Sequence, residues 1–295
     1  MDFLKRYLPA GKAGWRGALV SILILSNILV WGALYERRPS DKLSVYFLNV
    51  GQGDAIFIDS PQHTRVLVDG GKNRKVLTEL GKILPFADKR IDVVIATHPD
   101  ADHIGGLPEV VSRYKVGMFM EPGVKSLNSI DDELHRRLDE KNTAKLIARR
   151  GMTINLGGGA KLQILFPTQD VSNWETNRAS VVGRLAYGDR KFLLTGDSPI
   201  PIEKVLISLD EKMLDVDVLK AGHHGSRTST SLEFAEAVSP DYAVISAGKD
   251  NSYGHPHQEV LDILEKVGAK IVSTAERGTI KFETDGKILN LRKAL

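Results

Sequence analysis

Between Arg16 and Glu36 the chain has no charged residue. A helix over residues 17–35 would span roughly 28 Å, close to the thickness of a bilayer's hydrocarbon core. Trp31 and Tyr35 stand near one end of this run, where aromatic side chains meet the membrane surface. A buried core helix and a cleaved signal peptide are the alternatives. No small-x-small cleavage site follows the run, and the run is long for a signal peptide. We therefore expect an uncleaved transmembrane helix at residues 17–35.

The distribution of basic residues predicts the orientation of this helix. Four basic residues precede it and two follow it: Lys5, Arg6, Lys12, Arg16, then Arg37 and Arg38. The positive-inside rule places the more basic flank in the cytoplasm. We expect a cytoplasmic basic segment at residues 1–16 and a linker at 36–42. A single-pass membrane protein would then carry residues 43–295 as one extracytoplasmic domain.

Composition excludes several kinds of site. The chain has no cysteine, so disulfides, thiolate zinc sites and cysteine nucleophiles are absent. The formal net charge is +3, too small to demonstrate nucleic-acid binding by itself. A hydrophobic content of 42% is ordinary for a globular protein and excludes a disordered or collagen-like chain.

The remaining sequence reads as a mixed α/β domain. Runs rich in β-branched and aromatic residues predict strands over 43–48, 55–59, 65–68, 91–96, 161–166, 180–187, 191–195, 216–220, 242–246, 270–273 and 279–283. Amphipathic patterns predict helices over 75–84, 130–150, 232–237 and 258–267. This order suits an αββα sandwich, in which helices cover the outer faces of two packed sheets.

The densest group of candidate metal ligands follows the strand expected at 91–96. His98, Asp100, Asp102 and His103 fall within six residues. Extended or loop geometry lets alternate residues converge on one point. A polar surface loop is the alternative. Two histidines and two aspartates packed so closely behind a strand favour a metal centre.

Three further polar clusters also follow strands or turns. They are Gly196-Asp197, Gly222-His223-His224-Gly225 and Tyr253-Gly254-His255-Pro256-His257. A lone Gly-Asp pair is common in turns, and a histidine-rich turn is often a surface loop. A carboxylate at a strand end is nevertheless able to bridge two cations, so these clusters gain weight in combination with the His98 run.

Taken together and in this order, the motifs resemble the metallo-β-lactamase superfamily. More closely, the chain resembles the soluble C-terminal domain of the competence DNA-channel protein ComEC, over roughly residues 43–292. The motifs that carry this resemblance are the His98 run, Asn49–Ala55, Val68–Gly71, Gly222–Ser226 and Tyr253–Pro256. The resemblance implies a metallo-β-lactamase fold and a hydrolase with two divalent metal ions.

The resemblance also implies roles for individual residues. The metal ligands would be His98, Asp100, Asp102, His103, Asp197 and His223, with Asp197 as the bridging carboxylate. Asp69 would steady a ligand imidazole. The chain departs from the family pattern at two places. Asp100 stands where the family has histidine, and Asn177 lies in the stretch of the missing mid-chain histidine. His135, the one histidine in that interval, is read as solvated surface.

These departures bear on the metal. Carboxylate and amide oxygens suit Mn²⁺ or Mg²⁺ better than an all-nitrogen set, which suits Zn²⁺. The site around His98 and Asp100 is therefore expected to favour manganese. The site around Asp102 and His103 keeps a more zinc-like character.

The resemblance implies a phosphodiesterase or nuclease acting on DNA in a competence-like context. Asp102 and His255 are the expected catalytic residues, and Ser226 and Arg227 would hold a phosphate backbone. The ComEC domain is attached to a multi-span channel, whereas this chain has one expected anchor. Two alternatives stay open. One is a small-molecule or cell-wall phosphodiesterase using the same site. The other is a non-catalytic module that partners a separate DNA channel.

Overall fold

The computed structural model describes residues 12–36, 40–85 and 88–293. The chain divides into two compact units, Met1–Ser40 and Asp41–Leu295. Four of the six basic residues used for the topology prediction, Lys5, Arg6, Arg37 and Arg38, lie outside the described residues, as does part of the expected linker.

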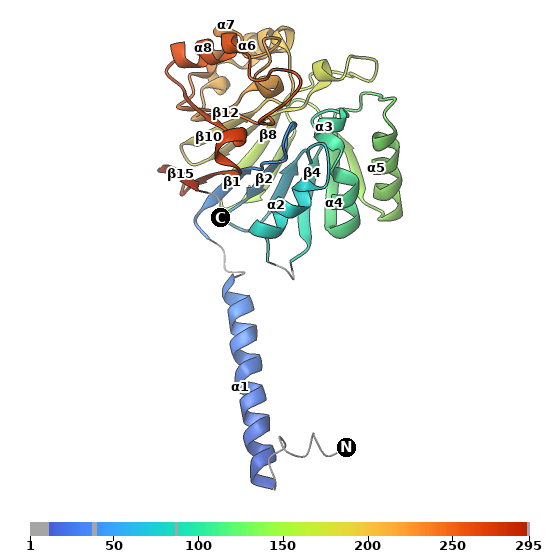
Figure 1. Cartoon of the computed structure of the whole chain (residues 1–295), viewed down its shortest axis with the longest axis vertical. Helices are drawn as coiled ribbons and strands as arrows, with labels where there is room; N and C mark the ends of the chain where they lie inside the picture. Colours follow the sequence, from blue (N-terminus) through green and yellow to red (C-terminus); the bar gives the residue numbers. More distant parts are fainter. Residues whose placement is uncertain (1–11, 37–39, 86–87, 294–295) are drawn as a thin grey trace. The chain divides into compact units, whose positions relative to one another are not determined.

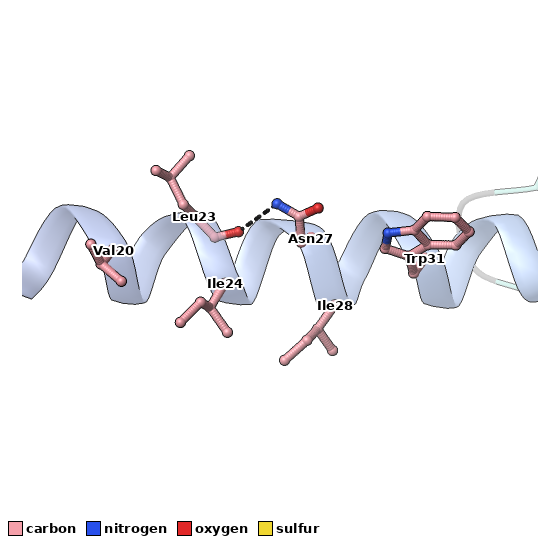
Figure 2. A pocket seen from close by; sticks show the side chains of 6 residues that line it. All are labelled: Val20, Leu23, Ile24, Asn27, Ile28 and Trp31. Carbon is pink, nitrogen blue, oxygen red and sulfur yellow. Dashed lines mark hydrogen bonds between the residues drawn. The ribbon is translucent and has the colours of Figure 1, made fainter.

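The first unit contains α1 (Lys12–Glu36), which begins five residues before the expected helix. Over Trp15–Gly32 it is long and apolar enough to cross a membrane, by length and composition. Its polar side chains bond locally. Ser26 Oγ and Asn27 Nδ2 each donate to the Leu23 carbonyl at 2.9 Å, the second bond being drawn in Figure 2. Such local bonds satisfy polar groups within an otherwise apolar helix.

The second unit is built on two mixed sheets. The first sheet has the order β15 (Leu289–Lys293), β14 (Ile280–Thr284), β1 (Leu43–Phe47), β2 (Ile56–Asp59), β3 (Arg65–Val68), β4 (Arg90–Ile95), β5 (Lys115–Glu121), β6 (Ala144–Ile147). The second sheet has the order β13 (Lys270–Ser273), β12 (Tyr242–Ile245), β11 (Val218–Lys220), β10 (Arg190–Leu194), β9 (Val182–Tyr187), β8 (Ala160–Phe166), β7 (Thr153–Gly157).

Helices cover the outer face of each sheet (Figure 1). Those of the first sheet are α2 (Lys75–Ile83), α4 (Leu107–Arg113) and α5 (Ser129–Glu140). Those of the second are α6 (Ile200–Leu214), α7 (Leu232–Val238) and α8 (Gln258–Lys266). Short helices α3 (Ala101–Ile104) and α9 (Thr274–Arg277), with 3-10 turns η2 (Asn177–Ala179) and η3 (Gly222–Gly225), complete the described elements.

Alternating side chains fill the space between the sheets. Phe47 and Val93 of the first sheet and Phe192 and Val218 of the second belong to one buried apolar cluster. Phe282 joins it, with its ring 6.1 Å from those of Phe47 and Phe192. Separate clusters lie between each sheet and its helices. Because each sheet is apolar on both faces, the expected αββα sandwich is confirmed.

Several elements differ from the sequence-based expectation. The helix expected over 130–150 ends at Glu140, because Asn142 has a φ of +51° and the chain then forms β6. Strands β5, β6, β7 and β15 and helices α4 and α6 were not expected. Pro199 is the N-cap of α6 and Pro201 lies in its first turn, where a helix tolerates proline because the N–H groups have no intrahelical partner.

The topology brings distant segments to one edge of the sandwich. Strands β3 and β4 are parallel in the first sheet, and β10, β11 and β12 are parallel in the second. Each of these strands ends just before a polar cluster, as sites in α/β sheets commonly do. Strand β2 is antiparallel to β3, with Ile56 opposite Val68. The segment that enters β2 therefore meets the same edge.

Candidate metal centre

The His98 run turns directly from β4 into α3. His98 and His103 are fully buried, and Asp102 lies between them and partly faces solvent. The turn packs against Gly53, which has a φ of +116°. A Cβ on Gly53 would lie 2.0 Å from the Asp102 carbonyl oxygen, so only glycine fits there. The backbone N–H of Asp54 donates to the same oxygen at 3.3 Å.

Asp197 is the point on which the histidines converge. It is buried just after β10. Its Oδ2 is surrounded by four imidazole Nε2 atoms, those of His98 at 3.9 Å, His103 at 3.3 Å, His223 at 3.6 Å and His224 at 3.5 Å. This carboxylate oxygen therefore faces histidines from both sheets.

Several of these buried atoms have no protein partner. Among the described residues, His98 Nε2, His103 Nε2, His224 Nε2 and Asp197 Oδ1 make no hydrogen bond. Unpaired buried polar atoms are costly and rare. One tight group has its ligand atoms within 4.8 Å of one another, and its members are Asp54, His103, Asp197 and His224. The donors therefore fit a divalent cation.

The opposite ring nitrogens are held by the protein. His103 Nδ1 lies 2.8 Å from Asp69 Oδ2, and Asp69 also accepts from the Thr97 N–H and hydroxyl, both at 2.7 Å. His224 Nδ1 lies 2.9 Å from the Ser246 carbonyl oxygen. Partners of this kind fix the ring and its tautomer, leaving Nε2 free for a metal. Asp69 occupies the expected position beside a ligand imidazole.

The structure distinguishes the two adjacent histidines of η3. His224 is buried, and its Nε2 lies 3.3 Å from Asp102 Oδ2. His223 has 25% of its side chain exposed, and its ring packs on that of His255 at 5.6 Å. Both have positive φ, which turns successive side chains to different sides. The tight group thus contains His224 in the place expected for His223, and His223 lies at its rim.

Two buried residues of the site were missed from the sequence. Asp54 Oδ2 lies 2.5 Å from Lys220 Nζ, and both side chains are buried. Lys220 is the last residue of β11. Asp54 could have been singled out, because it closes the Gly51–Asp54 run directly before a strand. A lysine at the end of an apolar strand carries no comparable signal, since its aliphatic stem usually lets the ammonium reach solvent.

Burial and mutual charge set the ionisation of the site. Burial would raise the pKa of Asp197, but the charges of His224 and His103 outweigh it and hold that pKa well below its usual value. Burial lowers the pKa of His98, and the charge of His103 lowers it further. For Lys220, the charges of Asp54 and Asp197 outweigh burial and raise the pKa. Burial raises the pKa of Asp100.

The other expected residues lie outside the tight group of four. Asp100 is 39% exposed, and its Oδ2 is 3.7 Å from His98 Nε2. The His255 ring lies 6.4 Å from that of His224. Arg227 is 63% exposed and its guanidinium faces Glu259 at 3.7 Å. The Ser226 hydroxyl accepts from that of Thr228 at 3.1 Å. Asp100 and Arg227 thus face solvent beside the buried group, whereas Ser226 is buried.

The last two residues singled out from the sequence are Asn177 and His135. Asn177 lies in η2 with its Oδ1 buried and without a hydrogen-bond partner. His135, expected on a solvated face, is 31% exposed and pairs with Glu121 at 3.2 Å and Asp131 at 3.5 Å. These three form a second, more exposed cluster on β5 and α5.

Known proteins are similar to this chain over most of its length. Residues 48–249 match the model of the metallo-beta-lactamase superfamily. The chain is 30% identical over 266 residues to ComE operon protein 3 of Bacillus subtilis, covering 84% of this chain and 34% of that protein. It is 29% identical over 263 residues to the competence protein ComA of Neisseria gonorrhoeae, covering 89% of this chain and 35% of that protein. The expected resemblance to competence proteins is confirmed, and the chain spans about a third of these relatives' length.

A solved structure supports the fold alone. The metallo-beta-lactamase fold protein YhfI from Bacillus subtilis superposes with a TM-score of 0.56 at 13% identity. The match covers 83% of this chain and 100% of that one.

The protonation of His224 predicts how the metal-free domain responds to pH. Burial would lower its pKa, but the charges of Asp197 and Asp54 raise it to about 9 from 6.5. Because folding raises its pKa, the protonated His224 imidazole stabilises the fold fully below pH 6.5. This stabilisation is lost as the pH rises through about 9. We expect the free energy of unfolding of the metal-free domain to fall by about 3 kcal/mol between pH 6.5 and 9.5. Thermal denaturation in the presence of a chelator measures this change.

A divalent cation has to displace the same proton, so Mn²⁺ should raise the Tm more at pH 9 than at pH 6.5. The His224→Gln variant is the control, because it should lose less stability over the same pH range. Equal pH slopes in parent and variant would remove His224 from this account.

Proposed function

Because the chain belongs to the metallo-beta-lactamase superfamily, we propose that its domain is a two-metal phosphodiesterase that cleaves DNA. One observation carries the proposal. Asp197 Oδ2 faces four imidazole nitrogens, and three of these are buried without a hydrogen-bond partner. A single carboxylate placed between two groups of ligands suits a bridging role between two cations.

The proposed ligands divide into two sets that share Asp197, and Asp54 is left out of both because its Oδ2 pairs with Lys220 at 2.5 Å. The first set is His98, Asp100 and Asp197. The second is Asp102, His103, Asp197 and His224, with His223 as the alternative that the sequence favoured. The first set has two carboxylates and one imidazole, so it is richer in oxygen and favours Mn²⁺ over Zn²⁺. When bound, such a metal pair activates water and stabilises the charge on phosphate oxygens.

The chain's own residues would orient the substrate at the rim. Burial lowers the pKa of His255 to about 4, with a further contribution from the charge of His223. The imidazole is therefore neutral at pH 7, which favours a hydrogen bond to phosphate over donation of a proton to the leaving group. Exposed Arg227, with Ser226 beside it, would hold the phosphate backbone once the guanidinium leaves Glu259.

DNA is proposed as the substrate because of the relatives. One is named competence protein ComA, another ComE operon protein 3, and a third recombination protein 2 of Haemophilus influenzae. The chain spans about a third of the length of those two competence relatives. A separate channel protein is the proposed partner. Small phosphodiesters and a non-catalytic role remain outcomes that the assay distinguishes.

A nuclease assay tests the proposal. Residues 40–295 should cleave DNA oligonucleotides faster with Mn²⁺ than with Zn²⁺, and faster than small phosphodiesters. Asp102→Ala should reduce turnover by at least about 10²-fold, the scale of losing a positioned catalytic group. His255→Ala should slow turnover while metal content stays nearly intact. A metal-loaded domain that hydrolyses no phosphodiester would favour the non-catalytic module.

Asp100 tests the argument from ligand hardness. Asp100→His restores the imidazole of the family pattern, so preference should shift from Mn²⁺ towards Zn²⁺. The measurement is the ratio of activities, and of affinities, with the two metals. If the variant kept the parent's ranking, metal choice would not depend on this oxygen donor.

The location of the domain is a separate proposal. We propose that α1 anchors the chain in a membrane and that the hydrolase domain lies outside the cytoplasm. Protease added to intact cells should then degrade residues 41–295. Full protection in intact cells, with degradation after lysis, would reverse the orientation while leaving the anchor in place.

A further inference from the structure

Lys220 places a buried positive charge beside Asp197, which is the proposed bridging ligand. Its side chain is fully buried, a costly position for an ammonium unless acceptors surround it. Nζ lies 2.5 Å from Asp54 Oδ2, donates to the Gly196 carbonyl oxygen at 3.0 Å, and is 3.7 Å from Asp197 Oδ1. Asp54 Oδ2 and the Gly196 carbonyl oxygen are within hydrogen-bond distance of the ammonium, and the charge of Asp197 lies farther away.

The Gly196 carbonyl is the peptide oxygen immediately before Asp197. Gly196 has a φ of +53°, and a Cβ there would lie 3.0 Å from Thr97 Cβ, so the turn is tightly enclosed. The N–H of Asp197 donates to Ser180 Oγ at 3.2 Å. Lys220 and Ser180 therefore hold the carbonyl oxygen and the N–H of the one peptide group that joins Gly196 to Asp197.

The two oxygens of Asp197 have different surroundings. Oδ1 faces the Lys220 ammonium, and Oδ2 faces the imidazoles. The ammonium on one side and the imidazoles on the other define the plane of the carboxylate.

We propose that Lys220 is a positioning residue of the metal centre: its ammonium fixes the Gly196–Asp197 turn so that the Asp197 carboxylate is presented to the metals. The inference rests on the metal binding of the proposed function. It does not follow from charge alone, because a cation beside the ligands repels another cation. Electrostatics predicts that removing Lys220 strengthens metal binding, whereas positioning predicts that binding weakens.

The opposite signs define the experiment. Lys220→Met alone would leave Asp54 buried without its partner, so both variants carry Asp54→Asn, which removes that charge. Mn²⁺ affinity is measured by calorimetric titration for the parent, for Asp54→Asn and for Asp54→Asn/Lys220→Met, with circular dichroism to check folding. We expect the double variant to bind Mn²⁺ at least about tenfold more weakly than Asp54→Asn. Equal or tighter binding would overturn the proposal.

Two further variants sharpen the comparison. Asp54→Asn/Lys220→Gln retains an amide donor for the Gly196 carbonyl and should recover part of the lost affinity, also if the Met variant folds poorly. No recovery in a folded Gln variant would count against positioning. Lys191→Met is the matched control, because Lys191 pairs with exposed Asp215 at 3.2 Å and should bind Mn²⁺ like the parent.

Electron paramagnetic resonance of the Mn²⁺-loaded proteins supplies a readout other than affinity. The parent should show the exchange-coupled signal of a bridged pair, and the double variant should show mainly isolated Mn²⁺. A parent that takes up no metal would overturn the proposed function together with this inference. A parent and double variant that share one coupled signal would overturn the inference alone.

Discussion

The site depends on one buried carboxylate, that of Asp197, which faces four histidine side chains. Asp197 stays ionised although burial opposes it, because His103 and His224 lie within 3.5 Å of its Oδ2. The imidazoles in turn keep their orientation because carbonyl and carboxylate oxygens hold their outer nitrogens. Burying any one of these side chains alone would cost free energy, and the interactions with the other members offset that cost. The group is therefore energetically coupled.

The sandwich explains how such a unit assembles from distant segments. Parallel strands end at the same edge of their sheet, so β3 and β4 deliver Asp69 and His98, while β10 and β11 deliver Asp197 and Lys220. The interior between the sheets needs no polar residues, and Phe47, Phe192 and Phe282 fill it. The polar residues of the site are thereby confined to one edge of the sandwich, where loops follow the ends of the strands.

Much of this was predictable from the chain, because the informative residues are clustered. Four candidate ligands in six positions behind an apolar strand identified the site, and the strand and helix order indicated the sandwich. The choice between His223 and His224 was not predictable, since it depends on two successive positive φ values. Lys220 could not be predicted for a different reason. Its proposed role depends on contacts with Asp54 and Gly196, which are distant in sequence and are brought together only by the tertiary structure. Strand β6 is fully exposed at a sheet edge, so it shows no alternation of burial.

The origin of the ligands has a mechanical consequence. His98 and His103 follow a strand of the first sheet, and Asp197 and His224 follow strands of the second. An ion held by both groups is a cross-link between the two layers, at the edge where their ladders have ended. Because unfolding has to separate the layers, such an ion would slow the escape from the native state more than it speeds folding. The metal centre would then also give the domain kinetic stability, and the resistance of the domain to proteases would depend on the supply of metal ions.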